Sequence, residues 1–181
     1  AALASLSDVL PITRNAVVEG LENVTIHARY EKMREADDKG ASVTVDVAHN
    51  PQAARVLAAN LTASGSPDVE TWAVFGMLRD KDMQEVAHTL LRHFDRWFVT
   101  GLPGVRGASL EELTQAMTKA GIDSTKIVKN DTVADALATA LAESAKREKG
   151  SVRIIAFGSF VTAAAAIECL RHDAREGAKV A

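Results

Sequence analysis

The chain has 181 residues, of which 47% are hydrophobic and 25% charged, and its formal net charge is −3 at pH 7. This composition is typical of a soluble globular protein with a sizeable core, and the negative balance argues against a broad surface for nucleic acid or anionic membranes. The single cysteine, Cys169, excludes an internal disulfide, and the longest apolar run, residues 154–167, is too short to span a bilayer, so we expect a cytoplasmic protein.

The first 23 residues predict a helix with a thin apolar face, which suits the boundary of a domain. Thr13 or Asn15 is the expected start of this helix. The chain begins with Ala-Ala-Leu-Ala, without Met and without the basic segment of a signal peptide, which we interpret as the start of a fragment or a processed product. We expect residues 1–23 to be a linker helix or the tail of another domain, and residues 24–181 to form the main domain.

The rest of the chain alternates between strand-like and helix-like patterns. Strands are predicted at residues 24–30, 43–47, 69–75, 96–100, 126–128 and 152–157, and residues 31–40 are predicted to be an exposed turn. Helices are predicted at residues 51–63 and 83–93, and three more begin near Ser109, near Thr132 and after Ser159, the last one ending near His172. Strand–helix units of this length predict a three-layer, Rossmann-like α/β fold with a mostly parallel sheet and helices on both faces.

A polar corner at residues 46–51 (Asp-Val-Ala-His-Asn-Pro) follows the second predicted strand. Asn50 is a good helix N-cap, and Pro51 suits the first helical position because its missing N–H would have no partner there. Asp46 is disfavoured inside a strand, so its presence needs a reason. Asp46 and His49 would flank a helix N-terminus, which favours phosphate or carboxylate, at the sheet edge where α/β proteins bind ligands.

Four strand exits are polar or glycine-rich, and in a parallel sheet all four lie on one edge. They are residues 46–50, 76–82, 101–107 and 158–159. Together they supply a carboxylate, an imidazole, Lys81, Arg106 and Ser159, a set that suits an anionic, phosphorylated ligand. Plainer interpretations stay open, because Lys81 and Arg79 also fit solvated loop charges, and Ser159 also fits a simple N-cap of the last helix.

Several familiar site chemistries are absent from the sequence. It has no Gly-x-x-x-x-Gly-Lys-Ser/Thr phosphate loop, no Gly-x-Gly-x-x-Gly after the first strand and no Gly-x-Ser-x-Gly nucleophile elbow. Four histidines show no metal-ligand spacing and are interpreted as surface or packing residues: His27, His88, His93 and His172. The residues alone predict an α/β domain that binds a phosphorylated or carboxylate ligand, and they leave the reaction open.

Five short motifs resemble those of the folylpolyglutamate synthase and dihydrofolate synthase family, which belongs to the Mur-ligase-type ATP-dependent amide ligases. Residues 46–51 resemble the family's Asp-x-Ala-His-Asn-Pro signature, and residues 76–82 its Gly-Met-Leu-x-Asp-Lys-Asp loop. Residues 105–109 resemble its Pro-Arg-Gly-Ala-Ser loop, and residues 157–160 include its Gly-Ser-Phe segment. Residues 28–31 lie where the family carries Pro-Gly-Arg-Phe-Gln. The order and rough spacing of all five motifs agree.

The resemblance covers nearly all of this chain but only the C-terminal part of the family's. It implies a C-terminal domain of the Mur ligase type, with residues 1–23 resembling the end of the N-terminal ATPase domain, which carries the phosphate loop and the magnesium ligands. The isolated chain is therefore expected to be inactive. The chain departs from the family pattern at Ala28, Val105 and Gln52, where the family has glycine, proline and frequently histidine.

In this family, ATP and a pteroate or folate carboxylate form an acyl phosphate, which the amine of L-glutamate then attacks. By this resemblance Arg29 would contact the nucleotide, Asp46 would contact a ribose hydroxyl, and His49 would be catalytic, near the phosphates and the incoming amine. Ser159 and Lys81, together with His49, would hold glutamate. ATP and Mg²⁺ are implied for the full-length enzyme, with no metal ligand expected in this chain.

The implied partners are L-glutamate, dihydropteroate or folate, ATP, and the N-terminal ATPase domain of the same polypeptide. A monomer is expected, with no nucleic acid or membrane partner. The alternative is a stand-alone, non-catalytic module that binds a nucleotide or an acidic metabolite, although half a crevice is expected to bind more weakly than about 1 mM. The sequence leaves open whether the parent protein makes dihydrofolate, extends polyglutamates or does both.

Overall fold

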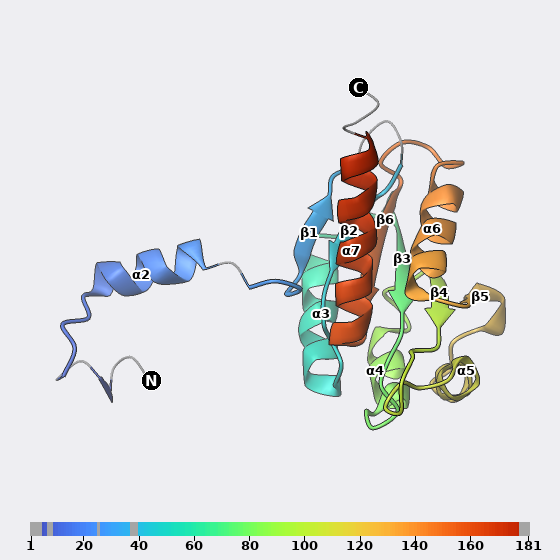
Figure 1. Ribbon diagram of the computed structural model, residues 1–181, viewed down its shortest axis with the longest axis horizontal. Coiled ribbons are helices and arrows are strands. Elements are labelled where there is room, and N and C mark those ends of the chain that lie inside the picture. Colours follow the sequence, from blue (N-terminus) through green and yellow to red (C-terminus); the bar gives the residue numbers. More distant parts are fainter. Residues whose placement is uncertain (1–4, 7–8, 25, 37–39, 178–181) are drawn as a thin grey trace.

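The computed structural model describes residues 5–6, 9–24, 26–36 and 40–177. It contains a six-stranded sheet in the order β1-β2-β6-β3-β4-β5 (Figure 1). The strands are β1 (Glu31–Arg34), β2 (Ser42–Val45), β3 (Glu70–Phe75), β4 (Arg96–Thr100), β5 (Ile127–Asn130) and β6 (Val152–Phe157). β1 is antiparallel to β2, and every other neighbouring pair is parallel. The predicted α/β fold with a mostly parallel sheet is confirmed.

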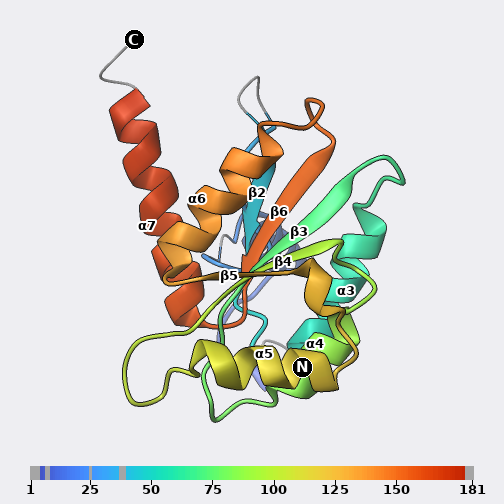
Figure 2. The same cartoon turned by 90° about the vertical axis from the view of Figure 1, so that its right-hand side faces the viewer.

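Helices cover both faces of this sheet, as Figure 2 shows. One side carries α3 (Pro51–Ala63), α4 (Met83–Leu90) and α5 (Leu110–Lys119), and the other carries α6 (Val133–Ser144) and α7 (Phe160–Gly177). Alternate residues of β3 enter two separate buried clusters. Trp72 and Val74 pack on the α6 and α7 side, whereas Ala73 and Phe75 pack on the side of α3, α4 and α5. This two-residue alternation is expected for a strand buried on both faces.

The predicted helix starts are confirmed by their caps. The side chain of Asn50 accepts a hydrogen bond from the backbone of the first turn of α3. Ser109 forms a capping box with Glu112 at the start of α5, and Thr132 forms a second one with Asp135 at the start of α6. Because each box satisfies backbone N–H groups that have no partner within the helix, these starts are defined locally by the sequence.

The prediction of a strand at residues 24–30 is wrong. Ala28 and Tyr30 have φ angles of 57° and 49°, a left-handed conformation that ends any extended strand. The first strand, β1, lies instead within residues 31–40, which were predicted to be an exposed turn. The physical reason is that carboxylates bind the backbone N–H groups of Ala28 and Tyr30, and this competes with strand pairing. Residues 25 and 37–39 lie outside the described residues.

Other element boundaries differ by smaller amounts. The helix predicted at residues 83–93 ends at Leu90, and α7 continues past His172 to Gly177. The strand predicted at residues 126–128 is β5, which follows a short 3-10 turn, η1 (Ser124–Lys126). These shifts lie at the ends of helices and strands, where the capping and packing signals in the sequence are weakest.

The helix predicted near the N-terminus is α2 (Arg14–Asn23), which starts after its N-cap Thr13. It contains no buried residue and lies to the side of the sheet in Figure 1. The division of the chain after residue 23 into two units stays a prediction. In the part of the chain that the structure describes, no helix has the length and apolar content needed to cross a membrane.

Candidate functional site

The carboxyl ends of the parallel strands form one edge of the sheet, and the four polar exits lie there as predicted. β2 leads into α3 on one face of the sheet, while its neighbour β6 leads into α7 on the opposite face. β3, on the other side of β6, again leads to the α3 face. Chains that depart in opposite directions leave a crevice between them, which is where open α/β sheets bind ligands.

Asp46 lies directly after β2 and binds two backbone N–H groups. Its Oδ2 accepts from Tyr30 N at 2.7 Å, and its Oδ1 accepts from Ala48 N at 2.7 Å. These bonds tie the end of β2 to the turn that carries Arg29. They explain why an acidic residue is placed at this position, because the carboxylate replaces the strand partners that both N–H groups lack.

Arg29 is exposed, and its guanidinium lies over the ring of Phe160, 5.8 Å from the ring centroid. Phe160 is the first residue of α7 and is 62% exposed, unusual for a large aromatic side chain. Beside it, Arg29, Asp46 and Asn50 are among the residues that line a cleft of about 350 Å³. This cleft is open to solvent at the start of α3 and combines a cation, a carboxylate and an amide.

His49 lies near Phe160 and is half-buried. Its ring centroid is 6.2 Å from that of Phe160, and its Nδ1 is buried without a hydrogen-bond partner among the described residues. Burial lowers the pKa of His49 below its usual value, and the nearby cations of Lys81 and Arg29 lower it further. A neutral imidazole with an unused ring nitrogen is therefore held at the crevice.

The exits of β3 and β4 carry charges that are already paired. Asp80 binds Arg106 at 2.9 Å and Lys81 at 3.2 Å, and this pairing, chiefly with Arg106, lowers the pKa of Asp80 to about 2. Arg79 donates from Nε to the carbonyl oxygen of Gly107 at 3.1 Å, which joins the two loops. Sequence reasoning placed Lys81 and Arg106 at the right edge, and the structure adds Asp80 as their shared partner.

Ser159 is 1% exposed and caps α7. Its Oγ accepts from Thr162 N at 3.0 Å and shares a hydrogen bond with Thr162 Oγ1. Thr162 Oγ1 in turn donates to the carbonyl oxygen of Gly76 at 2.7 Å, which links the exits of β6 and β3. Gly158, with φ of 116°, lets these backbones approach, since a Cβ there would lie 2.5 Å from Gly76 O.

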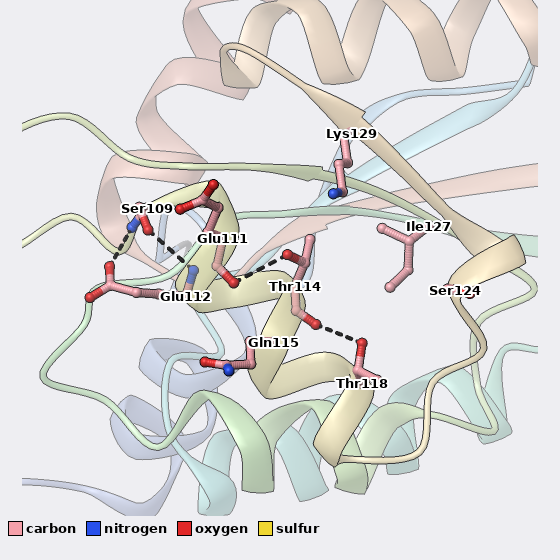
Figure 3. Close-up of a pocket in the computed structure, with 9 residues that line it drawn as sticks. All are labelled: Ser109, Glu111, Glu112, Thr114, Gln115, Thr118, Ser124, Ile127 and Lys129. Atoms are coloured by element: carbon pink, nitrogen blue, oxygen red, sulfur yellow. Dashed lines mark hydrogen bonds between the residues drawn. The ribbon is translucent and has the colours of Figure 1, made fainter.

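A cavity larger than this cleft lies elsewhere, between α5 and β5 (Figure 3). It measures about 580 Å³, and several of its polar side chains form hydrogen bonds at the start of α5 or within it. Ser109 and Glu112 bind each other's backbone N–H groups, and the hydroxyl groups of Thr114 and Thr118 donate to the carbonyl oxygens of Glu111 and Thr114, respectively (Figure 3). No unpaired buried group points to a ligand there among the described residues, so we place the candidate site in the crevice.

In the same described ranges, no group of three or more His, Cys, Asp or Glu side chains is arranged to hold a metal ion.

Comparison with known proteins assigns a family to this arrangement. Residues 28–160, which run from the Arg29 turn to Phe160, match the family model described as "Mur ligase, glutamate ligase domain". The chain belongs to this Mur ligase family. The membership expected from the five motifs is thereby confirmed, and the matched segment of this glutamate ligase domain contains every candidate site residue predicted from the sequence.

Relatives of this Mur ligase domain carry one recurrent name. A dihydrofolate synthase/folylpolyglutamate synthase of Haemophilus influenzae is 36% identical over 124 residues, which cover 68% of this chain and 27% of that protein. Its Escherichia coli namesake is 31% identical over 175 residues, 96% of this chain and 37% of that protein. The chain therefore spans about a third of the length of these relatives.

Solved structures agree with the Mur ligase assignment. The domain is similar to a bifunctional folylpolyglutamate synthase/dihydrofolate synthase with Mn, AMPPNP and L-glutamate bound. The TM-score is 0.78 at 29% identity, and the match covers 94% of this chain and 38% of that chain. The predicted fold, of the Mur ligase C-terminal type, is thus confirmed over nearly the whole chain.

Two features of the site were missed by the sequence analysis. Glu31 binds the turn that carries Arg29, and Phe160 contacts both Arg29 and His49. Phe160 stood in a recognised motif, but an aromatic residue at a helix start is usually a packing residue, so the pattern gave no reason to single it out. Glu31 follows Ala28 by three residues, the spacing of a local side chain-to-backbone bond, which was a usable signal.

Proposed function

We propose that this chain is the C-terminal domain of an ATP-dependent ligase that adds L-glutamate to dihydropteroate, to folates or to both through an acyl phosphate. The observation that carries the proposal is the meeting of Arg29, Lys81 and the unpaired imidazole of His49 at the strand crevice of a Mur ligase domain. Basic groups in this position would stabilise the negative charge on a phosphoryl group during its transfer.

In this proposal Arg29 and Asp46 bind the nucleotide. Arg29 is exposed, and no carboxylate lies within ion-pair distance of it among the described residues, so its guanidinium is free to meet phosphate. Both oxygens of Asp46 already accept one backbone N–H each. A carboxylate has about four acceptor positions, so Asp46 retains the capacity to accept ribose hydroxyl groups while its orientation is held.

His49 has the catalytic role in this proposal. When the amine of L-glutamate attacks the acyl phosphate, a C–N bond forms, phosphate leaves, and the nitrogen must lose a proton. The lowered pKa of His49 favours the neutral imidazole at pH 7, and its unused Nδ1 can accept that proton or a hydrogen bond from the amine. Correct placement of amine and acyl phosphate supplies a large part of the rate enhancement.

Lys81 and Ser159 are proposed to help hold glutamate. Lys81 is half-buried and lies close enough to His49 to lower its pKa, although it also pairs with Asp80. The Ser159 hydroxyl is engaged in capping α7, so its contribution to glutamate binding rests on family resemblance alone. Arg106, bound to Asp80, supports the loop that carries Lys81.

The remaining parts of the reaction belong to the rest of the parent protein. We propose that an N-terminal ATPase domain of the same polypeptide supplies the phosphate loop and the Mg²⁺ ligands, that α2 leads into that domain, and that the parent is a cytoplasmic monomer. Mg²⁺ would offset charge on the phosphates of ATP when bound there. The crevice described above would then form one wall of the closed site.

The test is transfer of radiolabelled L-glutamate to dihydropteroate and to tetrahydrofolate with Mg-ATP. This chain is compared with a protein extended upstream through the phosphate loop. We expect ligation by the extended protein alone and none by the isolated chain. Ligation by the isolated chain would contradict the division of labour, and no ligation by either protein would favour the non-catalytic binding module.

A further inference from the structure

The backbone around Arg29 is held in an unusual conformation. Ala28 and Tyr30, on either side of Arg29, both have positive φ angles. Non-glycine residues adopt this conformation at an energetic cost and keep it only where surrounding contacts hold them in place. Arg29 is thus presented by a turn that would relax if those contacts were removed.

Glu31 makes one of these contacts. Its Oε2 accepts from Ala28 N at 2.7 Å, and its Oε1 lies 3.0 Å from the Nδ1 of His27. The Glu31 side chain is only 18% exposed, whereas the His27 side chain is 72% exposed. Hydrogen bonding to Ala28 N and to His27 lowers the pKa of the Glu31 carboxyl, which keeps it ionised at neutral pH. A partly buried carboxylate is therefore committed to the backbone N–H that precedes Arg29.

Asp46 makes the matching contact on the other side of Arg29. It accepts from Tyr30 N, and the neighbouring Val47 N donates to the carbonyl oxygen of Ala28 at 3.0 Å. The turn is therefore bound at Ala28 N, Ala28 O and Tyr30 N. Glu31 is the first residue of β1 and Asp46 directly follows β2, and these two strands pair within the sheet.

We propose that Glu31 and Asp46 are positioning residues that clamp the turn of residues 28–30, so that the guanidinium of Arg29 is kept over Phe160 and beside His49. Glu31 acts only through the backbone of this turn and touches no ligand. The consequence for catalysis rests on the proposed function, because it assumes that Arg29 binds the nucleotide. The structural part of the proposal, the position of Arg29 relative to His49, is independent of that assumption.

His49 is a built-in reporter of the position of Arg29. The charged groups that face it are Lys81, Arg29, Asp46 and Asp80, and Phe160 packs against its ring. Since the cation of Arg29 disfavours protonation of His49, release of Arg29 raises the pKa of His49. Removal of the negative charge of Glu31 by itself acts in the opposite direction, so a rise in the pKa cannot be produced by charge loss.

The experiment is a pH titration of the His49 ring by NMR in the isolated chain. We expect Arg29→Ala and Glu31→Ala each to raise the pKa of His49 by a few tenths, and the double variant to match Arg29→Ala alone. Glu31→Gln should leave the value near wild type, because its amide oxygen still accepts from Ala28 N. Glu35→Ala, an exposed carboxylate paired with Lys32, is the matched control. If Glu31→Ala does not fold, Glu31→Asp replaces it. Its side chain keeps the negative charge but is too short to accept the hydrogen bond from Ala28 N.

The proposal is overturned if Glu31→Ala leaves or lowers the pKa of His49 while Arg29→Ala raises it, or if the two effects simply add. It is also overturned if Arg29→Ala has no effect, because Arg29 would then not lie beside His49. In the extended protein we expect Glu31→Ala and Arg29→Ala each to raise KM for ATP about tenfold with kcat little changed. If neither the wild-type extended protein nor any of its variants ligates glutamate, the proposed function is contradicted. The pH titration of His49 still tests whether Glu31 and Asp46 hold the Arg29 turn.

Discussion

The two halves of the carboxyl edge use similar residues in opposite ways. The β3–β4 half, made of the loops after those strands, pairs its charges internally: Asp80 binds both Arg106 and Lys81, and Arg79 binds Gly107 and Glu112. The β2–β6 half, made of Arg29, Asp46, His49 and Phe160, instead exposes a cation on an aromatic ring and leaves the Nδ1 of His49 without a partner among the described residues.

This difference is the basis on which we propose which half binds the ligand. Charges that pair with each other on the surface mainly shape a loop and contribute little stability. A buried polar atom without a partner has a cost that persists only when something else needs it, and such groups are concentrated at functional sites. We therefore propose that the β2–β6 half carries the chemistry and that the β3–β4 half supports it through Lys81. The following substitutions test this assignment.

Replacement of His49 by alanine should have the largest effect. In the extended ligase we expect kcat to fall about a hundredfold or more, because a positioned proton acceptor contributes on that scale. Urea unfolding of the isolated chain should change little, since the Nδ1 of His49 makes no hydrogen bond that would be lost. His88→Ala, on the exposed side of α4, is the control. Equal activity of His49→Ala and wild type would remove the β2–β6 half from catalysis.

Asp46→Asn should reduce both stability and nucleotide affinity. Asparagine has one acceptor oxygen, so either Tyr30 N or Ala48 N loses its partner, which costs about 1–2 kcal/mol in free energy of unfolding. KM for ATP should rise at least about tenfold in the extended ligase, because the Arg29 turn is released and a ribose contact is weakened. Urea unfolding and steady-state kinetics measure the two effects, with exposed Asp68→Asn as control. An unchanged unfolding midpoint would mean that these two hydrogen bonds do not hold the turn.

Much of this architecture could be predicted from the sequence because its causes are local. The caps at Asn50, Ser109 and Thr132 and the alternating apolar residues of the strands determine where elements begin and which way they face. The parallel order then follows from strand–helix alternation. The polar corner around Asp46 and His49 was found in the same way, since an acidic residue beside a buried strand is locally anomalous.

The rest depends on contacts between distant segments. Asp46 binds Tyr30 across sixteen residues, and Thr162 reaches Gly76 across eighty-six. No local pattern encodes these pairs, and the strand predicted at residues 24–30 was wrong because its apolar alternation is overridden by the two carboxylates that bind its backbone. Family resemblance supplied the roles of Arg29 and Ser159, whereas the burial of the Ser159 hydroxyl could be seen only in the structure.

Thr162→Val tests the link between the two halves. The substitution keeps the side-chain shape but removes the donor to Gly76 O and the partner of Ser159 Oγ, all of which are buried. We expect a loss of about 1–2 kcal/mol in free energy of unfolding, measured with urea. Thr114→Val is the control, because the hydroxyl of Thr114 binds only within its own helix. A loss no greater than that of the control would show that the halves are not coupled through this bond.

Asp80→Asn should have the smallest effect on stability and on ligation. It is also the sharpest comparison with His49→Ala, because Asp80 belongs to the paired half of the edge. The folded pKa of Asp80, about 2, lies below the usual value of 3.8 because Arg106 and Lys81 favour its ionised form. A lowered pKa means that the stabilisation is present above pH 3.8 and is lost as pH falls toward 2. Any difference in stability between wild type and Asp80→Asn should therefore be greatest near pH 7, shrink across that window, and weaken in 1 M salt (roughly a 3 Å screening length). Because Asp80 and Arg106 lie at the surface, where solvent screens their charges, the effect on the unfolding midpoint should be slight throughout. Ligation by the extended protein should persist, with at most a modest rise in KM for glutamate through the release of Lys81. A loss of activity as large as that of His49→Ala would reverse the assignment, because the paired half of the edge would then carry the chemistry.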